Sequence, residues 1–198
     1  MSTLKLDKIT GRLGVGGDVS PITFSGDAAT LSGTGVNFPA GHTIKTYYDE
    51  VTTSGATYGA DTWHNIMSVT TSVPASTSSN FIIQWMINYG SDDWGAWSRC
   101  FNTTTNTAIG VNTDSSMDNR VATTSGGQNE SGGNAGARMI NMIGLVRQQG
   151  CTLEAQTFKV QLYSGRDTIV LNRHTQNNND DITGNRGICS MLVQEIAG

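Results

Sequence analysis

The nine residues 81–89 constrain the fold more than any other segment of the chain. They read Phe-Ile-Ile-Gln-Trp-Met-Ile-Asn-Tyr. Side chains of a strand alternate between two faces, so every second residue, from Phe81 to Tyr89, contributes to one wholly apolar face. The residues between them form a mixed face. An apolar face backed by a mixed one predicts a strand in the core of an antiparallel β-sandwich.

The composition agrees with a β-rich chain. Thr, Ser, Asn and Gly supply 84 of the 198 residues, whereas Leu, Lys and Glu supply 17. The first group favours strands, turns and caps, and the second contains strong helix formers. Charged residues make up 14%, against about 25% in an ordinary soluble domain. These values argue against an α-rich protein and a typical cytosolic enzyme, and they suggest apolar surface buried between subunits.

Further segments between turn-forming residues show the pattern of strands. An all-β fold with eight or nine strands is typical of an antiparallel sandwich, and a jelly roll is its expected topology. Gly144 and the flanking strands favour a strand buried on both faces, rather than a helix, in the apolar segment 137–148. The expected strands besides 81–89 are 44–53, 63–73, 96–103, 107–112, 137–148, 155–163, 168–173 and 188–196.

Two segments differ from this pattern. Residues 1–41 are Gly-rich with short alternating pieces, and they are expected to form an extended N-terminal arm or shaft, with a flexible leader as the alternative. Residues 42–198 are expected to form the sandwich domain. Within it, the polar stretch 113–136 predicts a long loop that is functional or mobile.

Charge, hydropathy and cysteine content exclude several classes. The net charge is −4 without a basic run, so no nucleic-acid partner is expected. No apolar run is long enough for membrane insertion, and the start of the chain lacks the apolar region of a signal peptide, which suggests synthesis in a cytoplasm without export. Cys100, Cys151 and Cys189 are too few and too widely spaced for a disulfide framework or a zinc site, so buried free thiols are expected.

The sequence predicts no catalytic residue, no cofactor and no metal ligand. It lacks the nucleophile elbow of hydrolases, and its three His are far apart. The loop 177–181 resembles a series of oxygen ligands. However, Ile182 and Ile188 stand where a calcium-binding EF-hand requires Gly and Glu, so only an irregular ion site stays open there.

A cluster after the central strand is the candidate receptor or glycan contact: Asp92, Asp93, Trp94, Trp97 and Arg99. Aromatic rings stack on sugar rings, and carboxylates accept hydrogen bonds from sugar hydroxyls. The alternative is that the Trp rings pack in a subunit interface. Asp92 and Asp93 are adjacent and point in different directions, so glycan cleavage by this pair is disfavoured.

The last strand predicts contact between subunits. Both of its faces are partly apolar, so one is expected to meet the core and the other a neighbouring subunit. Met191, Val193 and Glu195 are the candidate trimer interface, with Gln194 or Glu195 near a three-fold axis.

Several short segments carry a resemblance to a known class of proteins. Residues 2–11, Ser-Thr-Leu-Lys-Leu-Asp-Lys-Ile-Thr-Gly, resemble the N-terminus of short tail-fibre and structural proteins of tailed bacteriophages, notably those of marine bacteria and cyanobacteria. Residues 36–42 are similar to the junction before their globular knob. Residues 74–83, 157–161 and 188–197 are similar to motifs of the knob itself.

This resemblance implies a homotrimer with a jelly-roll-like knob and an N-terminal segment that docks to other virion proteins. It implies localisation in the virion after synthesis in the bacterial host cytoplasm, and often attachment to the host surface. A glycan on that surface is the candidate receptor. It implies no catalytic residues. The alternative function is a capsid decoration or tail-structural protein that binds no receptor.

Overall fold

The chain divides into two compact units, Met1–Pro39 and Ala40–Gly198. In the first unit, β1 (Ile22–Ser25) and β2 (Ala28–Leu31) pair in antiparallel fashion. The computed structural model describes residues 40–91, 95–111, 123–127, 139–165, 168–173 and 187–198, and the backbone of residues 22–25 and 28–31.

Some of the predicted features lie outside these described residues. They are the expected contacts Asp92, Asp93 and Trp94, the loop 177–181 and most of the stretch 113–136.

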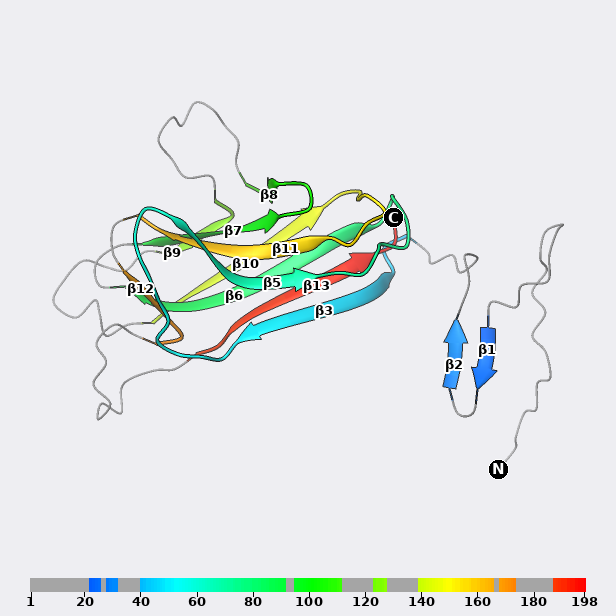
Figure 1. Cartoon of the computed structure of the whole chain (residues 1–198), viewed down its shortest axis with the longest axis horizontal. Helices are drawn as coiled ribbons and strands as arrows, with labels where there is room; N and C mark the ends of the chain where they lie inside the picture. The colour runs from blue at the N-terminus through cyan, green and yellow to red at the C-terminus, as the bar shows by residue number, and fades with distance from the viewer. Residues whose placement is uncertain are drawn as a thin grey trace. The chain divides into compact units, whose positions relative to one another are not determined.

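The second unit contains two antiparallel sheets, which form two layers (Figure 1). In the first sheet, the long strand β6 pairs with β10 along one edge, and with β13 and then β12 along the other. β3 lies outside β13, and β4 lies outside β12. The bounds are β3 Thr43–Val51, β4 Thr57–Tyr58, β6 Asn80–Ser91, β10 Ile140–Gln148, β12 Ile169–Leu171 and β13 Cys189–Ile196.

The second sheet has the strand order β5-β11-β7-β8, and β9 also pairs with β7. The turn 103–106 connects β7 and β8, which pair as a hairpin. The short strand β9 was not predicted, because its residues lie in the polar stretch expected to be a loop. The bounds are β5 Trp63–Thr70, β7 Ala96–Asn102, β8 Thr107–Ile109, β9 Ser125–Gly127 and β11 Thr157–Ser164.

The pairing of the strands is nested. β3 pairs with β13, β5 with β11, β6 with β10, and β7 with β8. The first of these strands therefore pairs with the last, and the pairing continues inward to the hairpin in the middle. The prediction of an all-β, antiparallel fold is confirmed, and the described residues contain no helix.

The two sheets enclose one hydrophobic core. The ring centroids of Phe81 on β6 and Phe158 on β11 are 5.1 Å apart, and Trp85 Nε1 donates a 2.9 Å hydrogen bond to Ser98 Oγ on β7. The predicted apolar face of β6 is confirmed, because its five side chains are at most 1% exposed. The alternating side chains of β11 are 0% exposed in the same core: Phe158, Val160 and Leu162.

Residues 137–148 were expected to be buried on both faces, and this is wrong for β10. Met142 and Val146 are buried, but Ile143 and Leu145 are 61% and 63% exposed. The second sheet covers only the inner face of β10. Among the described residues, no layer covers its outer face.

The predicted trimer interface on the last strand is also wrong. Met191, Val193 and Glu195 are 0% exposed inside the chain's own core. They therefore have no surface to offer to a neighbouring subunit. The outward positions of β13 are the alternating ones, such as Leu192 and Ile196, which are half-buried.

All three cysteines are free thiols, as expected. Cys100 and Cys189 are buried, and Cys151 is only partly buried. Burial raises the pKa of each thiol above its ordinary value. Within the described ranges, no helix has the length and apolar character needed to cross a bilayer.

Candidate functional site

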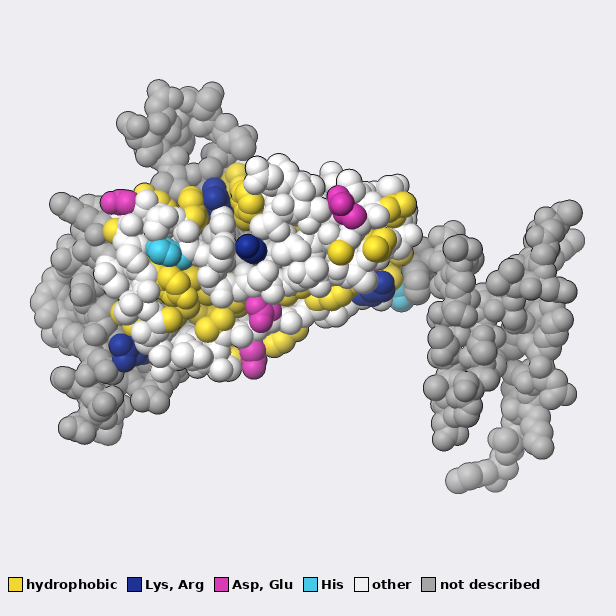
Figure 2. Space-filling model, in the orientation of Figure 1, with side chains coloured by type: hydrophobic (Ala, Val, Ile, Leu, Met, Phe, Trp, Pro, Cys, Tyr) yellow, Lys and Arg dark blue, Asp and Glu magenta, His cyan; other side chains and the backbone are white. Residues whose placement is uncertain are grey.

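Three aromatic residues form a row across the outer face of β5, β11 and β7. Trp97 lies opposite Tyr163, and Tyr163 lies opposite Trp63. The ring centroids are 6.0 Å apart for Trp97 and Tyr163, and 5.3 Å apart for Tyr163 and Trp63. All three side chains are half-buried, so each keeps part of its ring on the surface. Figure 2 shows hydrophobic side chains beside Lys and Arg over these strands.

A second row of polar side chains lies next to the aromatic row. Arg99 lies opposite Gln161, which lies opposite Asn65. Arg99 Nε donates to Gln161 Oε1 over 2.8 Å, and Gln161 Nε2 donates to Asn65 Oδ1 over 2.9 Å. A guanidinium carries five N–H donors, and this chain of bonds uses one of them. The two rows thus place amide and guanidinium groups directly beside aromatic rings.

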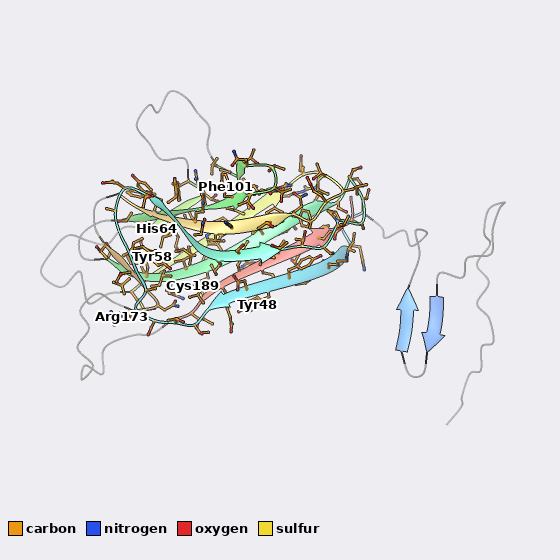
Figure 3. All side chains as sticks on the ribbon, in the orientation of Figure 1. Tyr48, Tyr58, His64, Phe101, Arg173 and Cys189 are labelled. Atoms are coloured by element: carbon orange, nitrogen blue, oxygen red, sulfur yellow. The ribbon has the colours of Figure 1, made fainter. Side chains whose placement is uncertain are left out.

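Aromatic rings also fix the position of the Arg99 guanidinium. Its Cζ lies 4.0 Å from the centroid of the Trp63 ring and 5.3 Å from that of Phe101, which projects from β7 (Figure 3). Both distances are within the range of a cation–π interaction. Partial burial lowers the pKa of Arg99 from its ordinary value, but an arginine stays charged at neutral pH. The site therefore presents an oriented positive charge.

Two glycines leave room for the Trp97 indole. Gly126 on β9 lies opposite Trp97, and Gly165 directly follows β11. A Cβ at either glycine would lie 2.8 Å from an indole carbon, which is closer than such atoms approach in proteins. The indole thus lies against backbone on both sides, and larger residues would displace it. We call the six residues Trp63, Asn65, Trp97, Arg99, Gln161 and Tyr163 the aromatic–arginine face.

A carboxylate lies beside Tyr163, the middle residue of the aromatic row. Tyr163 OH donates a long, 3.4 Å hydrogen bond to Asp61 Oδ1, and Asp61 is exposed in the loop before β5. In the same loop, the Gly59 carbonyl oxygen accepts a 2.9 Å hydrogen bond from His64 Nε2. Asp61 therefore supplies an acceptor of the kind that the sequence suggested for Asp92 and Asp93.

The structure brings together part of the predicted contact cluster. Trp97 and Arg99 lie two residues apart on the outer side of β7, as members of the aromatic–arginine face. The sequence interpretation missed the other four members of this face: Trp63, Asn65, Gln161 and Tyr163. The alternation of β11 places Gln161 and Tyr163 on its outer face, but this pattern does not reveal which strands are neighbours.

The chemistry of the aromatic–arginine face suits a sugar. Aromatic rings pack against the C–H groups of a pyranose, while guanidinium, amide and carboxylate groups bond to its hydroxyls. The described residues hold no group of three His, Cys, Asp or Glu that could bind a metal ion.

Comparison of the sequence with models of known protein families gave no match, and comparison with curated proteins also gave none. The case for a function is therefore made from the residues of this chain.

Proposed function

We propose that this protein is a structural protein of a bacteriophage virion, a trimeric fibre knob that attaches to a glycan on the host surface. The observation that carries the attachment is the aromatic row Trp63–Tyr163–Trp97 beside the polar row Arg99–Gln161–Asn65. Half-exposed aromatic rings next to oriented polar groups are a common basis of specific ligand recognition. The proposal involves no catalytic step.

The fold that we propose for the knob is a jelly-roll sandwich. The nested pairing supports it, because a jelly roll can be described as a long hairpin rolled into two sheets, in which the first strand pairs with the last. Jelly rolls are frequent in virion and lectin domains. The resemblance of residues 2–11 to phage fibre proteins supports the proposal that residues 1–41 form an arm that docks to other virion proteins.

The test is binding of the full chain to an array of bacterial surface polysaccharides and to intact cells of marine bacteria. We expect Trp97→Ala to weaken binding about tenfold or more, which corresponds to ~1.4 kcal/mol. Asn65→Ala, at an exposed position, should weaken binding without affecting the core. Leu153→Ala is the control, since Leu153 is 60% exposed and lies outside the face.

Two results would count against the proposal in different ways. If the wild-type chain binds neither polysaccharide nor cells, attachment is wrong, and the alternative role as a capsid decoration or tail-structural protein is favoured. If it binds, but folded Trp97→Ala and Asn65→Ala variants bind equally well, attachment occurs through another surface.

A further inference from the structure

The outer face of the other sheet carries a group of large apolar side chains. The register places Tyr48, Leu192, Gln84 and Leu145 in one row across β3, β13, β6 and β10. A neighbouring row on the same face contains Met86 and Ile143. We define the apolar face as Tyr48, Ile82, Met86, Ile143, Leu145, Leu192 and Ile196.

The exposure of this face is unusual for a surface that only meets water. Six large hydrophobic side chains of the described residues are exposed, and three of them, Tyr48, Ile143 and Leu145, belong to the apolar face. Their exposed fractions are 57%, 61% and 63%. Scattered apolar residues need no explanation, but a contiguous exposed patch marks an interaction site.

Two charges of opposite sign border the apolar face. Glu50 lies on β3 at one edge, in the row of Ser190, and Arg147 lies on β10 at the other edge, in the row of Ile82. The remaining outward residues that the register aligns on these four strands are uncharged. Because the two charges lie at opposite edges, the β3 edge of one copy is complementary in charge to the β10 edge of another.

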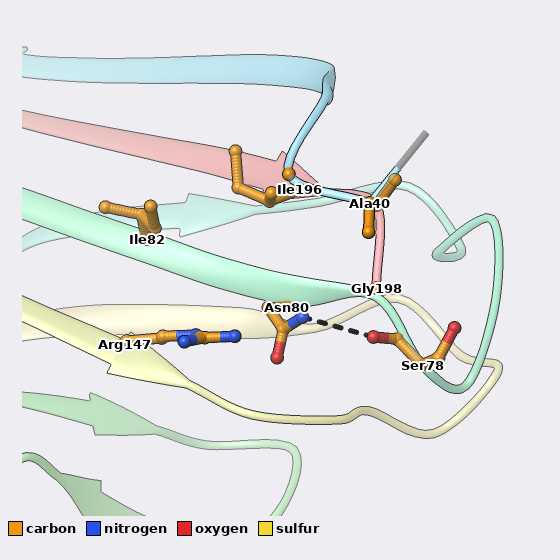
Figure 4. A pocket seen from close by; sticks show the side chains of 9 residues that line it. Ala40, Ser78, Asn80, Ile82, Arg147, Ile196 and Gly198 are labelled. Carbon is orange, nitrogen blue, oxygen red and sulfur yellow. Dashed lines mark hydrogen bonds between the residues drawn. The ribbon is translucent and has the colours of Figure 1, made fainter. Parts of the chain in front are cut away.

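The end of the face that carries Arg147 is hollowed. A pocket of about 610 Å³ is lined by Ile82, Arg147 and Ile196, together with Asn80 (Figure 4). Its walls are therefore continuous with the apolar face, on β6, β10 and β13. An apolar side chain of a partner could fill it.

We infer that the apolar face packs against a second copy of this chain and forms the interface of the oligomer. This inference rests on the homo-oligomer of the proposed function, but not on host attachment. In a ring of three copies, the β3 edge of each apolar face meets the β10 edge of the next copy, so Glu50 of one copy lies toward Arg147 of its neighbour. Opposite charges in this position fix register and disfavour other partners. The interface thus involves the outward residues of β13, in place of the buried ones.

The first test is the mass of the full chain in solution, measured by light scattering during size-exclusion chromatography. We expect the wild-type chain at three times 21.0 kDa. Leu145→Glu should reduce the mass to that of a monomer, because it places a charge within the apolar interface, on the β10 edge. Leu153→Glu is the matched control: Leu153 is 60% exposed, the substitution is identical, and the oligomer should persist.

The second test reverses the charges at the two edges. Glu50→Arg alone and Arg147→Glu alone should each shift dissociation of the oligomer to higher protein concentration. The two substitutions together should restore the wild-type behaviour, since they exchange the positions of the charges. Both residues are exposed, so the variants are expected to fold.

The outcomes separate this inference from the proposed function. A monomeric wild-type chain would overturn both the interface and the proposed oligomer. An oligomer that persists in folded Leu145→Glu would overturn the interface and leave the oligomer standing. If the variant with both Glu50→Arg and Arg147→Glu does not associate like the wild type, the packing of Glu50 against Arg147 is wrong. Glycan binding is measured separately and bears on none of these results.

Discussion

Gly144 determines how the largest residue of the core is packed. It lies on β10 directly opposite Trp85 on β6, and both side-chain positions face inward. A Cβ at Gly144 would overlap Cζ2 of the indole. Trp85 cannot easily move away, because it is 1% exposed and its Nε1 donates to Ser98. Protein interiors are close-packed, so even one added methyl group must displace its neighbours.

We predict that Gly144→Ala lowers the free energy of unfolding by about 2 kcal/mol, as overpacking of a core does. The measurement is urea unfolding followed by the fluorescence of tryptophan. Gly59→Ala is the control, because a Cβ there would meet nothing within 4 Å and its backbone is not left-handed. A Gly144→Ala protein as stable as the Gly59→Ala protein would show that Trp85 is less constrained than its contacts indicate.

Glu195 ties β13 to the loop between β5 and β6. Its Oε1 accepts hydrogen bonds from Ala75 N over 2.6 Å and from Ser79 Oγ over 2.9 Å. The side chain is 0% exposed, and its Oε2 is buried without a hydrogen-bond partner among the described residues. A buried carboxylate is costly unless its bonds are kept. The loop therefore depends on this single side chain for two of its polar contacts.

We predict that Glu195→Ala lowers the free energy of unfolding by about 3 kcal/mol, because it leaves the Ala75 N–H and the Ser79 hydroxyl without their acceptor. Glu195→Gln should cost less, since an amide oxygen can still accept both bonds. Glu154→Ala, at an exposed carboxylate bonded to Thr152, should stay within about 0.5 kcal/mol of wild type. Equal urea midpoints for the two alanine variants would contradict this role of Glu195.

The strands of the core were predictable because a period of two is visible in the sequence. The apolar face of β6 and the inward residues of β11 follow from that alternation alone. The alternation of β13 was equally clear, but alternation does not show which face of a strand points inward. The face of Met191, Val193 and Glu195 was therefore assigned to a neighbouring subunit, although it faces the core. β9 was missed because Ser125–Gly127 contains no apolar side chain and pairs with the edge of β7.

The candidate site could be predicted only where its residues are close in sequence. Trp97 and Arg99 are two residues apart on one strand, and both were found. Trp63 precedes Trp97 in the chain and Tyr163 follows it, each on a distant strand. They lie on the same face because the strand order is β5-β11-β7. Local patterns do not contain this order, because it depends on how the whole chain pairs.

The closed core holds two acidic groups in their protonated form. Burial raises the pKa of Tyr89 to about 12 and that of Cys100 to about 12, from ordinary values of 10.0 and 9.0. Both side chains are 0% exposed. Tyr89 OH also donates to Gly127 O over 2.8 Å, and the deprotonated form would lose this bond. Deprotonation of either group therefore opposes folding of the whole unit.

We predict that the free energy of unfolding falls at alkaline pH because Tyr89 and Cys100 must lose their protons. Their pKa values are higher in the folded chain, so the unfolded chain releases protons first, and stability falls as the pH rises. The contribution is fully present below about pH 9 and is lost as the pH rises to about 12. Urea midpoints across this range measure the decline. In the double variant Tyr89→Phe, Cys100→Ala, stability should start lower at neutral pH and decline less steeply. Parallel declines in the wild type and the double variant would assign alkaline unfolding to other groups.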